Sequence, residues 1–244
     1  MALLMCAPLC AAESSQVRPW DGARQLVRVI TPDWNSNHAI LQAFERTRVG
    51  WRAVSGEVPV VIGRTGTAWG IGLHPPQPGA LKQEGDARSP AGVFGIGRAF
   101  GYASSLSTGL RYTAMGIDDY CIDVTGSPVY NRIVNAHDLG RAAVQGSTEP
   151  MRRDLHANGD QRYKLGFLIE HNTHGLAGAG GCIFAHLRER ADSSTLGCTA
   201  MAEPAMKWLL SWLRAEDHPI FVLLPQREYR RLTASWHLPE LRAP

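Results

Sequence analysis

Residues 181–201 read GCIFAHLRERADSSTLGCTAM, and this stretch decides how the rest of the chain is interpreted. Its first half is an apolar run bounded by glycine, which predicts a buried strand. Because side chains alternate along a strand, Cys182, Phe184 and His186 are expected on one face. A polar loop follows, and the chain returns at Cys198, a distance that a loop closes at low entropic cost. The sequence therefore predicts that His186 and Cys198 meet at the end of a strand.

A cysteine beside a histidine can carry out nucleophilic catalysis. A free thiol with a pKa of ~8.5 is mostly protonated at neutral pH, and an adjacent imidazole shifts it toward the thiolate. The same imidazole can return a proton to a leaving amine. Gly197, just before the thiol, lets the backbone approach a substrate closely, and N–H groups near 196–198 can face a developing oxyanion. Since a single cysteine and histidine are more often structural, spacing alone does not establish catalysis.

Two separated motifs carry a resemblance to a known family. The later one consists of IFAH at 183–186 and TLGCTAM at 195–201, and the earlier one of EGD at 84–86 and SPAGVF at 89–94. In order and spacing, residues 26–224 resemble the L,D-transpeptidase (YkuD-like) catalytic domain of bacterial cell-wall enzymes. Two motifs in the right order are more specific than Ser/Thr-x-Gly-Cys alone.

The resemblance implies a mechanism for this chain. Cys198 would be the acylated nucleophile, His186 its acid/base partner, and Gly197 part of the loop that presents the thiol. The thiolate would attack a peptidoglycan stem tetrapeptide and release D-alanine, and the amine of a second stem would resolve the thioester into a cross-link. Water as acceptor would make the protein an L,D-carboxypeptidase, and a groove without chemistry would make it a cell-wall-binding module. Many members have arginine where this chain has Ala200, which leaves donor and acceptor preference open.

Four further residues are assigned to substrate binding. Arg188 follows the strand on the face of His186, and its guanidinium suits the carboxylates of a stem peptide. His171 could line the pocket, hydrogen-bond the active-site loop or lie at the rim. Thr195 and Leu196 belong to the loop that precedes the nucleophile.

The cysteines and histidines leave two alternatives open. Cys121 and Cys182 lie in strand-like apolar settings, so they form one disulfide or remain two buried thiols, and Cys198 stays single in either case. A zinc site could use Cys182, His186 and Cys198 with His171 or His174, but the short ligand pairs that mark such sites are absent from the sequence. We therefore expect neither a metal nor another cofactor.

The composition argues against two classes of protein, those that bind nucleic acid and those that span a membrane with a helix. The 244 residues carry 25 basic and 22 acidic side chains without long like-charge blocks, so binding to nucleic acid is not expected. No apolar run reaches the ~18 residues of a membrane-spanning helix. The expected partners are peptidoglycan stem peptides, and we expect a monomer.

The beginning of the chain indicates export. Residues 1–12 (MALLMCAPLCAA) are apolar and resemble the truncated end of a secretory signal. This predicts a periplasmic or other cell-envelope location. Residues 13–244 are then one catalytic domain, with its core at about 26–224 and a tail at 226–244 expected to include a helix packed on the outside.

Local patterns predict a mainly β (α+β) fold, a curved sheet or sandwich of the L,D-transpeptidase kind with flanking helices and its groove at the end of the His186 strand. Helices are expected at 38–46, near 151–155 and at 206–213. Strands are expected at 25–31, 51–54, 58–63, 93–96, 120–124, 130–134, 167–170, 182–187 and 220–224.

Overall fold

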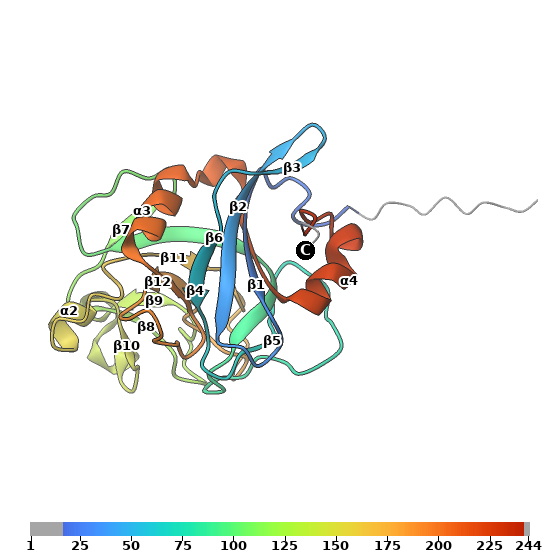
Figure 1. Ribbon diagram of the computed structural model, residues 1–244. Coiled ribbons are helices and arrows are strands. Elements are labelled where there is room, and N and C mark those ends of the chain that lie inside the picture. The colour runs from blue at the N-terminus through green and yellow to red at the C-terminus, as the bar shows by residue number, and fades with distance from the viewer. Residues whose placement is uncertain (1–16, 242–244) are drawn as a thin grey trace, which may run out of the picture.

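A computed structural model of the protein describes residues 17–241. The expected signal at residues 1–12, with Cys6 and Cys10, therefore lies outside the described residues. The chain folds mainly into β-strands with a few helices at the periphery (Figure 1). The prediction of a mainly β fold with flanking helices is confirmed at that level.

The regular elements are mainly strands, and the few helices in the described residues all lie in the second half of the sequence. The strands are β1 Gln25–Thr31, β2 His38–Thr47, β3 Gly50–Ala53, β4 Val58–Val61, β5 Thr67–Trp69, β6 Ser89–Gly101, β7 Tyr112–Ala114, β8 Asp119–Cys121, β9 Ile133–Asn135, β10 Glu149–Pro150, β11 Leu165–Ile169, β12 Phe184–Leu187, β13 Thr199–Met201 and β14 Ile220–Pro225. The helices are α1 Ala136–Leu139, α2 Arg153–His156, α3 Glu203–Trp212 and α4 Gln226–Trp236, with 3-10 turns at Arg141–Val144 and Ala215–Asp217.

Eleven strands form one mixed sheet that closes on itself. Its order is β1-β14-β6-β11-β12-β13-β4-β2-β3, with β5 and β7 joined to β6. Because β1 pairs with both β14 and β2, the two ends of the sheet meet, which satisfies strand edges that would otherwise stay unpaired. The seam between β13 and β4 is narrow, since a single pair, Ala200 with Val61, joins them. This seam lies directly beside the predicted nucleophile.

Helices α3 and α4 cover separate parts of this sheet. Helix α3 packs against β11 and β12, and its spacing buries Met206, Leu209 and Leu210, as the sequence predicted. Helix α4 packs against β1 and β14, so the tail does contain a helix on the outside (Figure 1). Strand β14 is buried at every position, which is typical of a strand covered on both faces.

The helix predicted at 38–46 is wrong, because this segment is strand β2. Leu41 and Phe44 have helical spacing, but Ala39, Leu41 and Ala43 are buried on one face at the period of a strand. Phe44 points to the other face, where the Arg28 guanidinium lies 4.6 Å from its ring centroid. With both faces covered, β2 loses the simple alternation that identifies a strand in sequence.

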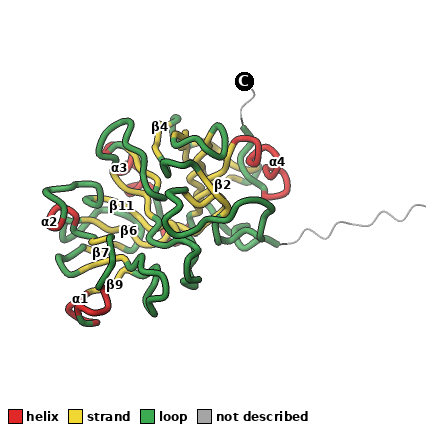
Figure 2. Tube along the Cα trace, turned by 90° about the horizontal axis from the view of Figure 1, so that it is seen from below, coloured by secondary structure: helices red, strands yellow, loops and turns green. Residues whose placement is uncertain are grey.

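A second sheet of three strands, in the order β10-β8-β9, lies at the end of the molecule away from α4 (Figure 2). A disulfide between Cys121 and Cys182 ties it to the segment that enters β12, with the two Cα atoms 5.9 Å apart. Of the two pairings left open by the sequence, the disulfide is the one formed. In residues 17–241 no helix is long and apolar enough to cross a membrane.

Candidate active site

His186 lies on β12, and Cys198 directly precedes the neighbouring parallel strand β13. The register of β12 and β13 pairs Ala185 with Thr199 and His186 with Ala200, so Cys198 lies opposite Phe184. Paired residues of adjacent strands point to the same face, which directs both functional side chains to one side of the sheet. Both line a cavity of about 580 Å³.

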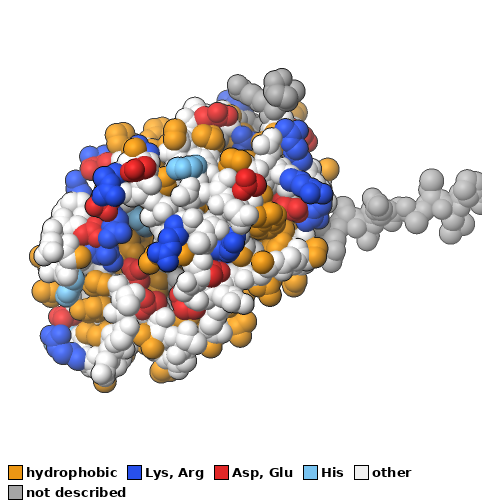
Figure 3. All heavy atoms as spheres, turned by 60° about the horizontal axis from the view of Figure 1, so that its bottom comes forward, with side chains coloured by type: hydrophobic (Ala, Val, Ile, Leu, Met, Phe, Trp, Pro, Cys, Tyr) orange, Lys and Arg blue, Asp and Glu red, His pale blue; other side chains and the backbone are white. Residues whose placement is uncertain are grey.

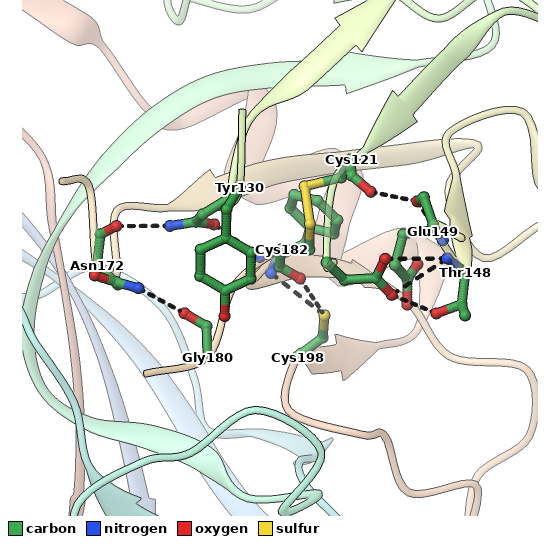
Figure 4. Close-up of a disulfide and its surroundings, with 12 residues drawn as sticks. Cys121, Tyr130, Thr148, Glu149, Asn172, Gly180, Cys182 and Cys198 are labelled. Carbon is green, nitrogen blue, oxygen red and sulfur yellow. Dashed lines mark hydrogen bonds between the residues drawn. A yellow bond between two sulfur atoms is a disulfide. The ribbon is translucent and has the colours of Figure 1, made fainter. Parts of the chain in front are cut away.

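The thiol of Cys198 is held by backbone groups. It is the free cysteine of the described chain and is 8% exposed. Its Sγ accepts a hydrogen bond from the N–H of Phe184 at 3.3 Å and donates to the carbonyl of Cys182 at 3.5 Å (Figure 4). Within residues 17–241 no hydrogen bond joins this sulfur to the ring of His186.

The segment before β12 does not alternate as predicted. Strand β12 begins at Phe184, and Cys182 has a φ of 55°, so its backbone has left the strand conformation. Cys182 therefore does not share a strand face with His186. The turn instead aims the carbonyl of Cys182 at the sulfur of Cys198, a contact that no sequence pattern indicates.

The tautomer of His186 follows from its backbone contact. Nδ1 lies 2.7 Å from the carbonyl oxygen of Leu187, which can only accept, so Nδ1 carries the proton. Nε2 is then unprotonated and can take a proton. The ring of Tyr163 packs edge-on against the imidazole, with centroids 5.2 Å apart, and fixes its orientation.

Electrostatics keep both groups neutral in the free protein. Burial, together with the positive charges of Arg162 and Arg153, lowers the pKa of His186 to about 4. Burial, together with the negative charge of Glu149, raises the pKa of Cys198 to about 12. The expectation that the imidazole would shift the thiol toward a thiolate is therefore wrong for this state.

Two hydroxyl groups fasten the loop that carries the nucleophile. The buried Ser89 donates to the carbonyl of Gly197 at 2.6 Å, and Thr195 donates to the carbonyl of Cys198 at 2.6 Å. Thr195 also accepts from the N–H of Gly197 at 3.1 Å, so this N–H is already engaged and does not face an oxyanion here. Ser89 comes from the SPAGVF motif, which explains physically why the two motifs occur together.

Gly197 needs to be glycine because space is limited. Its φ is 156°, and a Cβ there would lie 3.2 Å from both the carbonyl oxygen of Arg88 and the Cδ1 of Ile183. The loop can therefore approach the strand at this point only without a side chain.

The other predicted binding residues differ in their placement. Thr195, Leu196 and Arg188 line the cavity, and Leu196 is 66% exposed. Arg188 also lines a neighbouring cavity, while the ion pairs of its loop are made by Arg190.

His171 does not line this cavity. It is 2% exposed, its Nδ1 accepts from the N–H of Ile71 at 3.1 Å, and its Nε2 donates to the carbonyl of Ala179 at 3.0 Å. The structure gives it the role of bracing a loop. Of the three possibilities considered for His171, the one in which it lines the pocket is therefore excluded.

The zinc site considered from the sequence would use the sulfur of Cys182 as a ligand. The sulfur of Cys182 is bonded to Cys121, so it cannot act as a thiolate ligand. Among the residues described, no group of three or more His, Cys, Asp or Glu side chains could hold a metal ion.

Sequence reasoning missed several polar residues of the cavity. Tyr163 donates to Glu149 Oε2 at 2.5 Å, and the guanidinium of Arg153 lies 3.6 Å from the same oxygen. On the other side Lys82 forms an ion pair of 2.5 Å with Asp86. Glu149 and Tyr163 come from the polar segment 135–165, which has no periodic pattern, so no signal pointed to them. Asp86 belongs to the EGD motif and was open to detection.

Charged side chains of both signs line the cavity. They are Arg64, Lys82, Arg153, Arg162 and Arg188, with Glu84, Asp123, Glu149 and Glu189. Basic and acidic groups also lie side by side on the face of the molecule seen in Figure 3. A ligand that itself carries both charges fits such a lining better than a polyanion.

Comparison with family models, with curated proteins and with solved structures finds no match for this chain. A functional assignment therefore depends on the sequence motifs and on the geometry of the cavity.

Proposed function

We propose that this protein is an L,D-transpeptidase that acts on peptidoglycan stem peptides. One observation carries the proposal: a free cysteine, Cys198, and a histidine with an unprotonated Nε2, His186, face the same cavity. A nucleophile beside a base is the arrangement that acyl transfer requires. The closed, mainly β sheet with the site at the end of β12 is compatible with the proposed L,D-transpeptidase fold.

The chemistry has two steps. In the first, Sγ of Cys198 attacks the carbonyl carbon of the L,D bond while its proton passes to Nε2 of His186. The imidazolium then gives that proton to the leaving D-alanine, and a thioester remains on Cys198. In the second step an amine from another stem attacks the thioester, the C–S bond breaks, and the cross-link forms. Because the resting thiol and imidazole are both neutral, each proton moves only during bond formation.

The proposal includes export to the periplasm or another part of the cell envelope. The Cys121–Cys182 disulfide supports it, because disulfides persist in oxidising compartments. The peptidoglycan substrate would be found in the same place.

Intact-mass analysis after treatment with a carbapenem tests the proposal. The wild-type protein should gain one covalent adduct, and Cys198→Ala should gain none. His186→Gln should react more slowly by about 10²–10⁴-fold, because the base is lost while the thiol remains. An adduct on Cys198→Ala, or no adduct on folded wild-type protein, would refute the assignment.

A further inference from the structure

Glu149 places a carboxylate in the wall of the cavity that holds the nucleophile. Strand β10 pairs Glu149 with Cys121, and the disulfide links Cys121 to Cys182, whose carbonyl contacts the sulfur of Cys198 (Figure 4). The carboxylate and the nucleophile are therefore fixed to each other through a short covalent and hydrogen-bonded path. Glu149 and Cys198 both line this cavity.

The two oxygens of this carboxylate have different surroundings. Oε2 accepts from the hydroxyl of Tyr163 and faces Arg153. Oε1 accepts no hydrogen bond from any residue in 17–241, and it is not sealed from solvent. The side chain is 22% exposed, and it lines the cavity. One oxygen thus anchors the group and the other stays open for a ligand.

An open carboxylate matters for the second step of the proposed reaction. The acceptor amine is an ammonium ion at neutral pH and cannot attack until it loses a proton. His186 serves the sulfur, and its low pKa makes it a weak base toward an ammonium ion. Burial raises the pKa of Glu149, which makes its carboxylate a stronger proton acceptor than an ordinary one.

We propose that Glu149 binds the ammonium group of the acyl acceptor through Oε1 and removes its first proton, and that it thereby directs the Cys198 thioester toward an amine instead of water. This inference rests on the proposed function and deepens it, because it assigns the choice between cross-linking and hydrolysis to one residue. Water carries no charge and gains less from the carboxylate.

Protons and bonds balance in this step. The ammonium gives one proton to the carboxylate of Glu149 and becomes a neutral amine. Its nitrogen forms a bond to the thioester carbon, and the second proton passes through His186 to the sulfur as the C–S bond breaks. The products are an amide and the thiol of Cys198, and Glu149 later returns its proton to solvent.

Other charged groups affect the pKa of Glu149 and the pKa of Cys198. The groups that act on Glu149 lie in the segment after β8, in α2 and in the turn before β11. The groups that act on Cys198 include Glu149 itself. These groups are Asp123, Arg153 and Arg162 for Glu149, to which the neutral Tyr163 adds a hydrogen bond, and Glu149, Lys82 and Arg153 for Cys198. The cations make the carboxylate more acidic, but burial dominates and leaves its pKa raised.

The test measures how the thioester is partitioned. Purified wild-type protein and Glu149→Gln are incubated with a disaccharide-tetrapeptide as both donor and acceptor. Released D-alanine reports acylation, and the ratio of cross-linked dimer to tripeptide reports amine against water. Glu216→Gln is the control, because Glu216 is an exposed carboxylate in the 3-10 turn Ala215–Asp217 and does not line this cavity.

Near neutral pH, Glu149→Gln should lower the dimer-to-tripeptide ratio about tenfold, the loss expected for one charge-assisted hydrogen bond, while D-alanine is still released. Glu216→Gln should keep the wild-type ratio, and Glu149→Asp should recover part of it. Above the pKa of the acceptor amine the difference between wild type and Glu149→Gln should shrink, because the amine is already neutral. A purely structural role would not produce this pH dependence.

Two results would overturn the inference in distinguishable ways. If wild-type protein releases D-alanine and Glu149→Gln keeps the wild-type ratio at every pH, the role of Glu149 is refuted and the proposed function stands. If wild-type protein neither releases D-alanine nor forms a carbapenem adduct, the proposed function falls and this inference falls with it.

Discussion

Replacing Ser89 by alanine should both destabilise the protein and loosen the nucleophile loop. Ser89 is fully buried, and its Oγ accepts from the N–H of Gly63 at 2.9 Å while donating to the carbonyl of Gly197 at 2.6 Å. The carbonyl of Cys198 is also within reach at 3.1 Å, but Thr195 donates to it as well. Alanine therefore leaves two buried backbone groups, one N–H and one C=O, without a partner.

The magnitude follows from those two groups. An unpaired buried donor or acceptor costs about 1–3 kcal/mol, so Ser89→Ala should lower the free energy of unfolding by about 2–6 kcal/mol. This is a large part of the ~5–15 kcal/mol that stabilises a typical domain. The loop should also open more often, so Cys198 should react faster with iodoacetamide.

Urea denaturation measures the first effect, and mass spectrometry of Cys198 alkylation measures the second. Ser211→Ala is the control: its hydroxyl donates to the carbonyl of Trp208 at an exposed position, and its loss should change stability by less than about 0.5 kcal/mol. If Ser89→Ala unfolded at the same urea concentration as Ser211→Ala and Cys198 reacted at the wild-type rate, the described role of this hydroxyl would be refuted.

Three further predictions concern buried titrating groups and the disulfide. Burial lowers the pKa of His171 to about 4, so the unfolded chain takes up a proton first as the pH falls below about 6.5. Stability should therefore decrease by about 3 kcal/mol between pH 6.5 and 4, and an unchanged pH slope of urea unfolding in His171→Gln would contradict this. Replacing Cys121 and Cys182 by serine should cost about 4 kcal/mol, because the bond closes a loop of 61 residues; equal urea midpoints with and without the bond would refute it. With its pKa raised to about 12, native Cys198 should react with iodoacetamide near neutral pH more slowly than in urea-unfolded protein, and equal rates would argue against a buried thiol.

Local sequence patterns predicted the elements whose structure depends on residues close together along the chain. The strand at β1 and the buried face of α3 follow from residue types within a few positions of each other. The segment 38–46 failed because β2 is buried on both faces, so its pattern depends on which elements cover it. That information is not in the segment itself.

Local sequence patterns likewise predicted one part of the candidate site and missed another. The motifs predict that His186 and Cys198 lie close together, and both line one cavity. Glu149 could not be predicted, since no pattern in its segment indicates that it lies across from Cys121. The position of His171 was also left undecided by its neighbours, because the backbone groups that occupy its two nitrogens lie far from it along the chain or in a loop without a regular period.

By itself the sequence determined the class of fold, most strand positions, and a cysteine and histidine brought together by a short loop. These depend on side-chain periodicity and on short loops, which act over few residues. Only the tertiary structure decided the burial that shifts the pKa of those two groups, and it placed the Glu149 carboxylate in the wall of their cavity. Burial and long-range pairing arise when segments such as β10 and β12 come together across the chain.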